Sequence, residues 1–205
     1  MESKEKIVCI LDYGSGNVKS VFNLLETFNV KTIISNKAVD FEKASHFILP
    51  GVGSFGAAME KINANIPLEE LKKDVFVNKK PFLGICVGMQ VLADFGNEFG
   101  RHKGLGWISG EVKKLETDLP LPHMGWNNTN IIQNSPLVAG INEKADFYFV
   151  HSYAFFPTDQ KEVTARTTYG ENFASIIQKD NIFGVQFHPE KSQSAGRILI
   201  SNFLN

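Results

Sequence analysis

Two motifs far apart in the sequence contain side chains that together could carry out covalent catalysis. The first, Gly84-Ile85-Cys86-Val87-Gly88-Met89-Gln90, places Cys86 where an apolar run passes into a helix-like segment. The flanking glycines permit a sharp strand-to-helix turn, on which the sulfur projects above a sheet and the positive end of the helix favours thiolate over thiol. The sequence therefore predicts that Cys86 is a nucleophile.

The second motif, Gln186-Phe187-His188-Pro189-Glu190-Lys191, follows another apolar run. His188 could take the thiol proton, and Glu190 could orient the imidazole. A histidine before proline is more often a loop residue, and a lone cysteine such as Cys9 is more often a small buried hydrophobe. The joint occurrence of Cys86, His188 and Glu190 favours the catalytic interpretation.

The elements that must position these residues alternate in the first half of the chain. Short apolar runs predict strands, and apolar residues at helical spacing predict helices. In chain order we expect a strand at residues 7–11, a helix at 17–28, strands at 31–35 and 47–49, helices at 55–62 and 68–78, a strand that ends at Cys86 and a helix at 87–95.

The second half is richer in glycine and turns, and its apolar runs are shorter. We expect strands at residues 111–115, 129–132, 147–150, 163–168, 174–178 and 183–187, and a final helix at 194–203. Alternating strands and helices predict an α/β fold with a mostly parallel sheet and helices on both faces. The later strands predict a smaller mixed or antiparallel sheet. No linker, repeat or low-complexity run divides the chain, so we expect a single domain over residues 1–205.

Composition limits the classes of partner. The chain has 205 residues, of which 43% are apolar and 21% charged, and 21 basic against 22 acidic side chains give a net charge of −1. This balance gives no basic patch typical of nucleic-acid binding, and no apolar run approaches the roughly 20 residues that span a membrane. Only two cysteines occur, without metal-type spacing, so we expect no metal, no cofactor and a reducing compartment. The charged start, residues 1–6, is unlike a signal peptide, and a cytoplasmic protein is expected.

The two catalytic motifs resemble those of the class I, or triad, glutamine amidotransferase family, which has a flavodoxin-like α/β fold. Further motifs, in the same order over nearly the whole chain, are similar to the glutaminase subunits of imidazole glycerol phosphate synthase within that family. These motifs are Asp12-Tyr13-Gly14-Ser15-Gly16-Asn17, Pro50-Gly51-Val52-Gly53-Ser54-Phe55, His123-Met124-Gly125-Trp126-Asn127 and Tyr148-Phe149-Val150-His151-Ser152-Tyr153.

The resemblance implies a substrate and a mechanism. Glutamine would be attacked by the Cys86 thiolate, with His188 and Glu190 completing the triad. The oxyanion hole would comprise the backbone N–H of Val87 and the loop Gly51, Val52 and Gly53, whose glycines expose amide groups. Without the resemblance, that loop is more often a turn, and no phosphate-loop motif follows it.

The resemblance also implies the glutamine pocket and the protein partner. Substrate would be held by Gln90, His151, Ser152 and Tyr153, whereas the alternatives are a solvated helix residue for Gln90 and a half-buried aromatic for Tyr153. Ammonia would pass to a (β/α)8-barrel cyclase subunit, in a heterodimer that makes imidazole glycerol phosphate and AICAR in histidine biosynthesis. Trp126, Tyr148 and Lys191 match the family's interface positions, but aromatics in the core and a solvated lysine are the alternatives.

Three rival functions share much of this pattern. The first is an equivalent glutaminase that feeds another synthase, such as a sugar amidotransferase of surface polysaccharide assembly; the continuation Ala154-Phe155-Phe156 departs from the family pattern and keeps it open. The second is a non-catalytic subunit that only binds glutamine, against which the intact triad argues. The third is a cysteine peptidase of the same broad fold, against which Gln90 and the Pro50–Gly53 loop argue.

Overall fold

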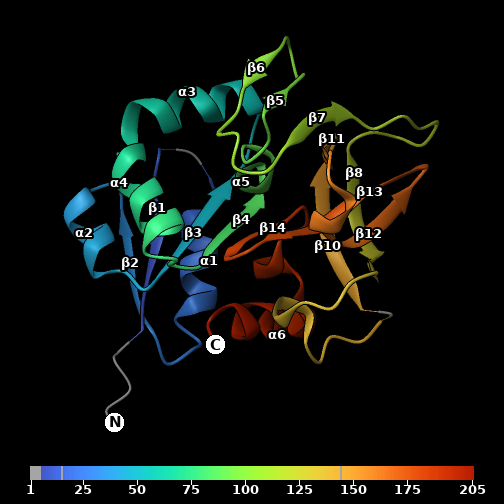
Figure 1. Cartoon of the computed structure of the whole chain (residues 1–205). Helices are drawn as coiled ribbons and strands as arrows, with labels where there is room; N and C mark the ends of the chain where they lie inside the picture. Colours follow the sequence, from blue (N-terminus) through green and yellow to red (C-terminus); the bar gives the residue numbers. More distant parts are fainter. Residues whose placement is uncertain (1–5, 15, 144) are drawn as a thin grey trace.

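The computed structural model describes residues 6–14, 16–143 and 145–205, and its centre is an eight-stranded sheet of order β2-β1-β3-β4-β14-β13-β12-β9 (Figure 1). The first five of these strands are parallel neighbours: β1 (Ile7–Leu11), β2 (Lys31–Ser35), β3 (His46–Gly51), β4 (Phe82–Cys86) and β14 (Ile182–Val185). The sheet continues with antiparallel strands: β13 (Glu171–Lys179), β12 (Val163–Tyr169) and β9 (Asn130–Ile131). The expected mostly parallel sheet is confirmed.

Helices cover both faces of the parallel strands, which explains why those strands are apolar throughout. Figure 1 shows α2 (Ala38–Lys43), α3 (Phe55–Asn65) and α4 (Leu68–Lys72) on one side of the sheet, and α1 (Val18–Leu25) and α6 (Gln193–Phe203) on the other. The Phe203 ring of α6 lies 5.4 Å from the His46 ring and 6.1 Å from the Phe183 ring, so this helix packs beneath β3 and β14.

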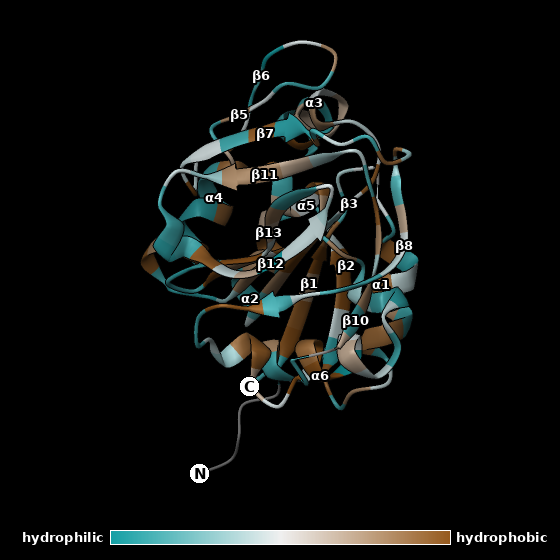
Figure 2. Cartoon of the chain, turned by 90° about the vertical axis from the view of Figure 1, so that its right-hand side faces the viewer, coloured by the Kyte–Doolittle hydropathy of each residue, from teal (hydrophilic) through white to brown (hydrophobic). Residues whose placement is uncertain are grey.

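Two smaller sheets follow, where the sequence predicted one. The first is an antiparallel pair, β8 (His123–Asn128) and β10 (Asp146–His151), in which Trp126 pairs with Tyr148. The second is mixed and has the order β11 (Tyr153–Pro157), β7 (Gly110–Lys114), β5 (Phe95–Gly96) and β6 (His102–Lys103). Figure 2 shows hydrophobic residues concentrated in the central strands and hydrophilic ones around them.

The helix predicted at residues 87–95 is wrong in length, because α5 ends after one turn (Val87–Gln90). The carbonyl oxygens that would continue it are taken by a later segment: Val91 O accepts from Leu105 N, and Leu92 O accepts from Trp107 N and Ile108 N. The apolar residues 91–93 are all fully buried rather than arranged as one helical stripe. Tertiary packing therefore overrides the helical pattern.

Other differences concern the ends of elements and short elements. The segment expected as a helix at 68–78 is α4 followed by a π-helical turn, η1 (Lys73–Val77). The sequence did not predict α2, β5, β6, β8 or β11. It also did not predict three short 3-10 helices, which are η2 (Pro136–Val138), η3 (Gln160–Glu162) and η4 (Pro189–Lys191).

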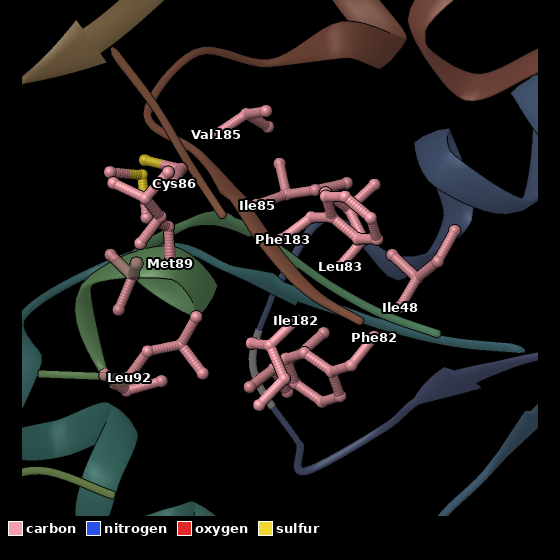
Figure 3. Close-up of a cluster of buried hydrophobic side chains, with 14 of the residues drawn as sticks. Ile48, Phe82, Leu83, Ile85, Cys86, Met89, Leu92, Ile182, Phe183 and Val185 are labelled. Carbon is pink, nitrogen blue, oxygen red and sulfur yellow. The ribbon is translucent and has the colours of Figure 1, made fainter. Parts of the chain in front are cut away.

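The hydrophobic core reaches the predicted nucleophile. In Figure 3, Ile48, Leu83 and Phe183 from three adjacent strands lie together, and Cys86 lies at the end of the same cluster. Residues 1–5, whose charge counted against a signal peptide, and Ser15 of the Asp12–Asn17 motif lie outside the described residues. Within the described ranges, no helix has the length and apolar character needed to cross a membrane.

Candidate active site

Cys86 occupies a backbone conformation that side chains rarely adopt. Its φ of 55° and ψ of −112° place it outside the allowed wells for L-residues, a strain of about 1–3 kcal/mol that must be supported by its surroundings. The support is the close packing of α5 on the sheet. A Cβ at Gly88 would lie 1.8 Å from Leu49 O, and one at Gly84 would lie 2.4 Å from Gly88 O. The glycines on both sides of Cys86 are therefore required by contact distance.

His188 and Glu190 form a buried pair at the start of η4. His188 Nδ1 lies 2.8 Å from Glu190 Oε1, and their side chains are 4% and 0% exposed. Asn17 at the start of α1 donates from Nδ2 to the same carboxylate oxygen at 2.9 Å. Glu190 Oε2 is buried and has no partner among the described residues. The carboxylate is thus fixed in position and directed at the imidazole, as the sequence predicted.

The surroundings of His188 favour its charged form. Burial opposes the charge, but hydrogen bonds with Cys86 and Glu190 outweigh it and raise the imidazole pKa to about 10. Burial likewise opposes the charge on Glu190, but the hydrogen bond with His188 dominates and lowers the carboxyl pKa. At neutral pH His188 is therefore an imidazolium between Cys86 and Glu190. It already carries the proton that a leaving amine needs.

Two further groups contact the sulfur. Gln186 donates from Nε2 to Cys86 Sγ at 3.7 Å, and Sγ lies 3.9 Å from Val150 O. Gln186 is fully buried. Gln186 was not predicted as a site residue, although a glutamine between Val185 and Phe187 in an apolar run is the signal that could have identified it.

Cys86 opens into a pocket of about 470 Å³. The pocket brings together most of the residues expected to bind substrate or stabilise an oxyanion; its lining includes Val52, Gly53, Cys86, Val87, Gln90, His151, Ser152, Tyr153, His188 and Lys191. Gly51 is not among them. A Cβ at Gly51 would lie 2.5 Å from Gly88 N, so this glycine lies beneath α5 and lets the loop approach the nucleophile.

Gln90 and His151 are both tied to the backbone of Tyr153. Gln90 Nε2 donates to Tyr153 O at 2.8 Å, and His151 Nδ1 donates to the same oxygen at 3.0 Å. Gln90 is 3% exposed, so the alternative of a solvated helix residue is wrong. Tyr153 is half-buried, as its alternative also predicted.

Glu98, which was not predicted as a site residue, is the one carboxylate among the residues that line this pocket. Its Oε2 accepts from the backbone N–H of Phe55 at the start of α3, at 2.9 Å. The adjacent Phe99 lines the pocket too and is 87% exposed. Both lie between β5 and β6, two short strands that no periodic pattern indicated.

The expected interface residues lie together on the outer side of β8 and β10. Trp126 is 48% exposed and its ring centroid lies 5.9 Å from that of Tyr148. Lys191 Nζ lies 5.6 Å from the centre of the Tyr148 ring, and Lys191 also lines the pocket. A core position for Trp126 is therefore wrong, and the exposed cluster adjoins the site.

A metal centre and a second, larger hollow are the alternatives to this site in the described part of the chain. No group of three or more His, Cys, Asp or Glu residues there is arranged to hold a metal ion. A larger hollow of about 680 Å³ lies between β9 and η2, but its lining has one ionisable side chain, Glu143, and neither a cysteine nor a histidine. A strained cysteine and an imidazolium that line one pocket, with a carboxylate bonded to the imidazolium, fit acyl transfer through a thioester.

Comparison with known proteins decides which family uses this geometry. The sequence model described as "Glutamine amidotransferase class-I" matches residues 9–205. This chain belongs to the class-I glutamine amidotransferase family. Among solved structures, PurLQS from Thermotoga maritima matches with a TM-score of 0.76 at 18% identity over 98% of both chains, which supports the fold.

Curated relatives of this amidotransferase are much closer in sequence. "Imidazole glycerol phosphate synthase subunit HisH 1" of Campylobacter jejuni is 46% identical over 96% of this chain and 98% of its own length. "Imidazole glycerol phosphate synthase subunit HisH" of Methanocaldococcus jannaschii is 43% identical over 97% of this chain and 98% of its own. The resemblance inferred from the motifs is thereby confirmed over nearly the full length.

Proposed function

We propose that this amidotransferase is the glutaminase subunit of an imidazole glycerol phosphate synthase. It hydrolyses glutamine to glutamate and ammonia and delivers the ammonia to a (β/α)8-barrel cyclase subunit that makes imidazole glycerol phosphate and AICAR in histidine biosynthesis. The buried Cys86–His188–Glu190 constellation is the observation that carries the glutaminase chemistry. The near-full-length similarity to HisH subunits supports the choice of synthase over a sugar amidotransferase.

The chemistry follows from the protonation state of the pair. The Cys86 thiolate attacks the carboxamide carbon, and the His188 imidazolium gives its proton to the departing nitrogen so that ammonia leaves. The neutral imidazole then takes a proton from water, which attacks the thioester and releases glutamate. Glu190 holds the imidazole ring in position and stabilises its positive charge each time the ring is protonated.

The oxyanion and the amino-acid groups of glutamine need separate partners. Val87 N–H and the loop residues Val52 and Gly53 line the pocket beside Cys86 and are our candidates for the oxyanion hole, with Gly51 supporting the loop from below. Gln90, His151, Ser152 and Tyr153 line the same pocket and would bind the substrate backbone. Glu98 supplies the negative charge that an α-ammonium group requires.

Docking would use the exposed cluster Trp126, Tyr148 and Lys191, which combines aromatic surface with a cation beside the pocket. We propose that a single domain over residues 1–205 carries all these functions. Cys9 and Cys86 are both free thiols, which supports action in the reducing cytoplasm.

The proposal is tested by measuring how glutamate release depends on the cyclase subunit. Glutamate release is measured for the isolated chain, for its complex with the cyclase and for the complex with the cyclase's acceptor ligand. One oxyanion donor is worth about 10²–10³ in rate, so we expect at least that increase if docking orients the Val52–Gly53 peptide. Full activity of the isolated chain would contradict partner gating, and no activity in any state would contradict the glutaminase assignment.

The docking surface has a matched control. Trp126→Ala should weaken binding of the cyclase at least tenfold, because large aromatic side chains at the centre of an interface contribute most to affinity. Ile132→Ala removes an equally exposed apolar side chain, 45% against 48%, beside the hollow between β9 and η2. Equal binding of both variants would place the interface elsewhere.

A further inference from the structure

Gln186 is placed to act on the reacting sulfur itself. Its Nε2 lies 3.7 Å from Cys86 Sγ, and its side chain is fully excluded from solvent. An amide can present either its donor or its acceptor end, and these have opposite effects on a thiolate: an N–H stabilises the anion, whereas a carbonyl oxygen repels it. What holds the amide in one orientation therefore decides its effect.

Gln90 fixes that orientation. Its Nε2 has two hydrogens, and the two acceptors within reach are Tyr153 O at 2.8 Å and Gln186 Oε1 at 3.1 Å. With both hydrogens engaged, Gln90 holds Gln186 Oε1 toward itself, and Gln186 Nε2 is left facing Cys86 Sγ. Reversing the Gln186 amide would set two N–H groups against each other at one end and an oxygen against the sulfur at the other.

A pair of buried histidines fixes the other end of this arrangement. His151 Nδ1 faces Tyr153 O, a carbonyl that can only accept, so this nitrogen carries the proton. Burial lowers the pKa of His151 to about 3 and that of His123 to about 4, so both rings are neutral. His151 Nε2 must then accept from His123 Nδ1, 3.1 Å away, and His123 Nε2 accepts from Asn127 Nδ2 at 3.3 Å.

The His123 ring is held in place for this role. It stacks on Tyr169, with ring centroids 4.0 Å apart, and on Phe149 at 4.9 Å, both at 23° between planes. Tyr153 O selects the Nδ1–H tautomer of His151, and the His123 donor satisfies the lone pair that this tautomer leaves on the buried Nε2. His123 thus stabilises the His151 tautomer that donates to the carbonyl to which Gln90 is also bound.

We propose that Gln186 is a thiolate-stabilising donor to Cys86, and that Gln90, Tyr153 O and the His151–His123 pair are the positioning groups that hold its amide in the donating orientation. The hydrogen bonds form one continuous chain from Asn127 on β8 to the sulfur. This inference rests on the proposed function for its catalytic consequence, but the contact with Cys86 can be tested without glutamine.

The first test measures the alkylation of Cys86 by iodoacetamide against pH in the full-length chain, with Cys86→Ser as the background for Cys9. Gln186→Met keeps the length of the side chain and removes the donor. The midpoint of the alkylation profile should therefore rise by about one pH unit, which is the shift expected when a thiolate loses one hydrogen bond. Gln186→Glu places a carboxylate beside the sulfur and should raise the midpoint further. An unchanged midpoint in a folded Gln186→Met or Gln186→Glu variant would overturn the proposal.

The second test separates positioning from packing at His123. His123→Asn can keep a donor near the Nδ1 position, whereas His123→Leu cannot, and both variants lose the ring that stacks on Tyr169. In the complex with the cyclase, we expect the KM for glutamine to stay within about twofold for His123→Asn and to rise at least fivefold for His123→Leu. Equal KM values for the two variants would mean that the His123–His151 pair contributes only packing and does not position the Tyr153 carbonyl.

These tests also distinguish this inference from the proposed function. A wild-type complex that releases no glutamate but shows the alkylation shift would contradict only the proposed function. Glutamate release with no shift in either Gln186 variant would contradict only the role of Gln186.

Discussion

Replacing Glu190 by Gln tests how much of the catalysis depends on charge within the His188–Glu190 pair. The substitution keeps the shape and an oxygen that can accept from His188 Nδ1, now 2.8 Å away, and from Asn17 Nδ2. It removes the negative charge beside an imidazolium whose side chain is 4% exposed. The change therefore isolates the electrostatic contribution from the geometric one.

The loss of transition-state stabilisation in Glu190→Gln can be estimated from the geometry of the pair. At 2.8 Å and an effective dielectric constant of 20, the Coulomb energy of the pair is about 6 kcal/mol, which is an upper bound because the neutral hydrogen bond remains. Hydrogen bonds to charged groups contribute about 1.5–3 kcal/mol, and we expect a loss in this range. It corresponds to a fall of about 10–150-fold in kcat, and it should bring the His188 pKa down from about 10 by one to two units.

The assay is glutamate release against pH in the ligand-bound complex with the cyclase. Because deprotonation of His188 ends the reactive form, the alkaline limb of the profile should move to lower pH in Glu190→Gln by the same one to two units. Glu60→Gln, at a solvent-exposed position of α3, is the matched control and should leave rate and profile unchanged. A Glu190→Gln enzyme with the wild-type rate and alkaline limb would refute the reasoning.

Three further outcomes follow from the structure. Gly88→Ala should destabilise the fold by about 3 kcal/mol or more, since its Cβ would meet Leu49 O at 1.8 Å. The control Gly140→Ala, at φ +71° in open space, should lose only about 1–2 kcal/mol of stability. Equal urea midpoints for the two variants would contradict this expectation. The pKa values of buried His46, His123 and His151 are lowered to about 4, 4 and 3 mainly by burial, so below pH 6.5 the unfolded chain binds protons that the folded chain does not. These three histidines should lower the free energy of unfolding by about 4 kcal/mol between pH 7 and 5.5. His188 offsets roughly 1 kcal/mol of this, because its folded pKa is raised to about 10 and its stabilisation is complete only below its unfolded pKa, so a net fall of about 3 kcal/mol is expected. A flat profile would contradict the three lowered pKa values. Glu98→Gln should raise the KM for glutamine about tenfold with little change in the ammonia-driven reaction, and an unchanged KM would remove Glu98 from the substrate site.

The sequence predicted the parts of the fold that depend on local pattern. The apolar strands around Cys86 were predicted because burial on both faces leaves continuous apolar runs, and α1 and α3 were predicted from apolar residues at helical spacing. The single turn of α5 was not, because the carbonyl oxygens of residues 91–93, which would continue the helix, accept from residues 105–108, and no local pattern connects the two segments. The short strands β5 and β6 lack a period long enough to detect.

For the site, too, local sequence motifs could be predicted and tertiary contacts could not. Cys86, His188 and Glu190 were predicted from motif chemistry, and His188 is hydrogen-bonded to both of the others in the structure. Glu98 and Gln186 were missed because their significance lies in what they face rather than in their neighbours along the chain. Glu98 reaches the pocket from the loop between β5 and β6, and Gln186 faces the sulfur only because β14 lies beside β4.

In the proposed function, ammonia is produced from glutamine at Cys86 and consumed by the cyclase subunit. The most direct measurement compares glutamine-driven with ammonium-driven synthesis of imidazole glycerol phosphate by the complex, for wild type and Cys86→Ala. We expect Cys86→Ala to abolish the glutamine-driven reaction and to retain the ammonium-driven rate, since the fold and the docking surface are left in place. Glutamine-driven synthesis near the wild-type rate in Cys86→Ala would contradict the account.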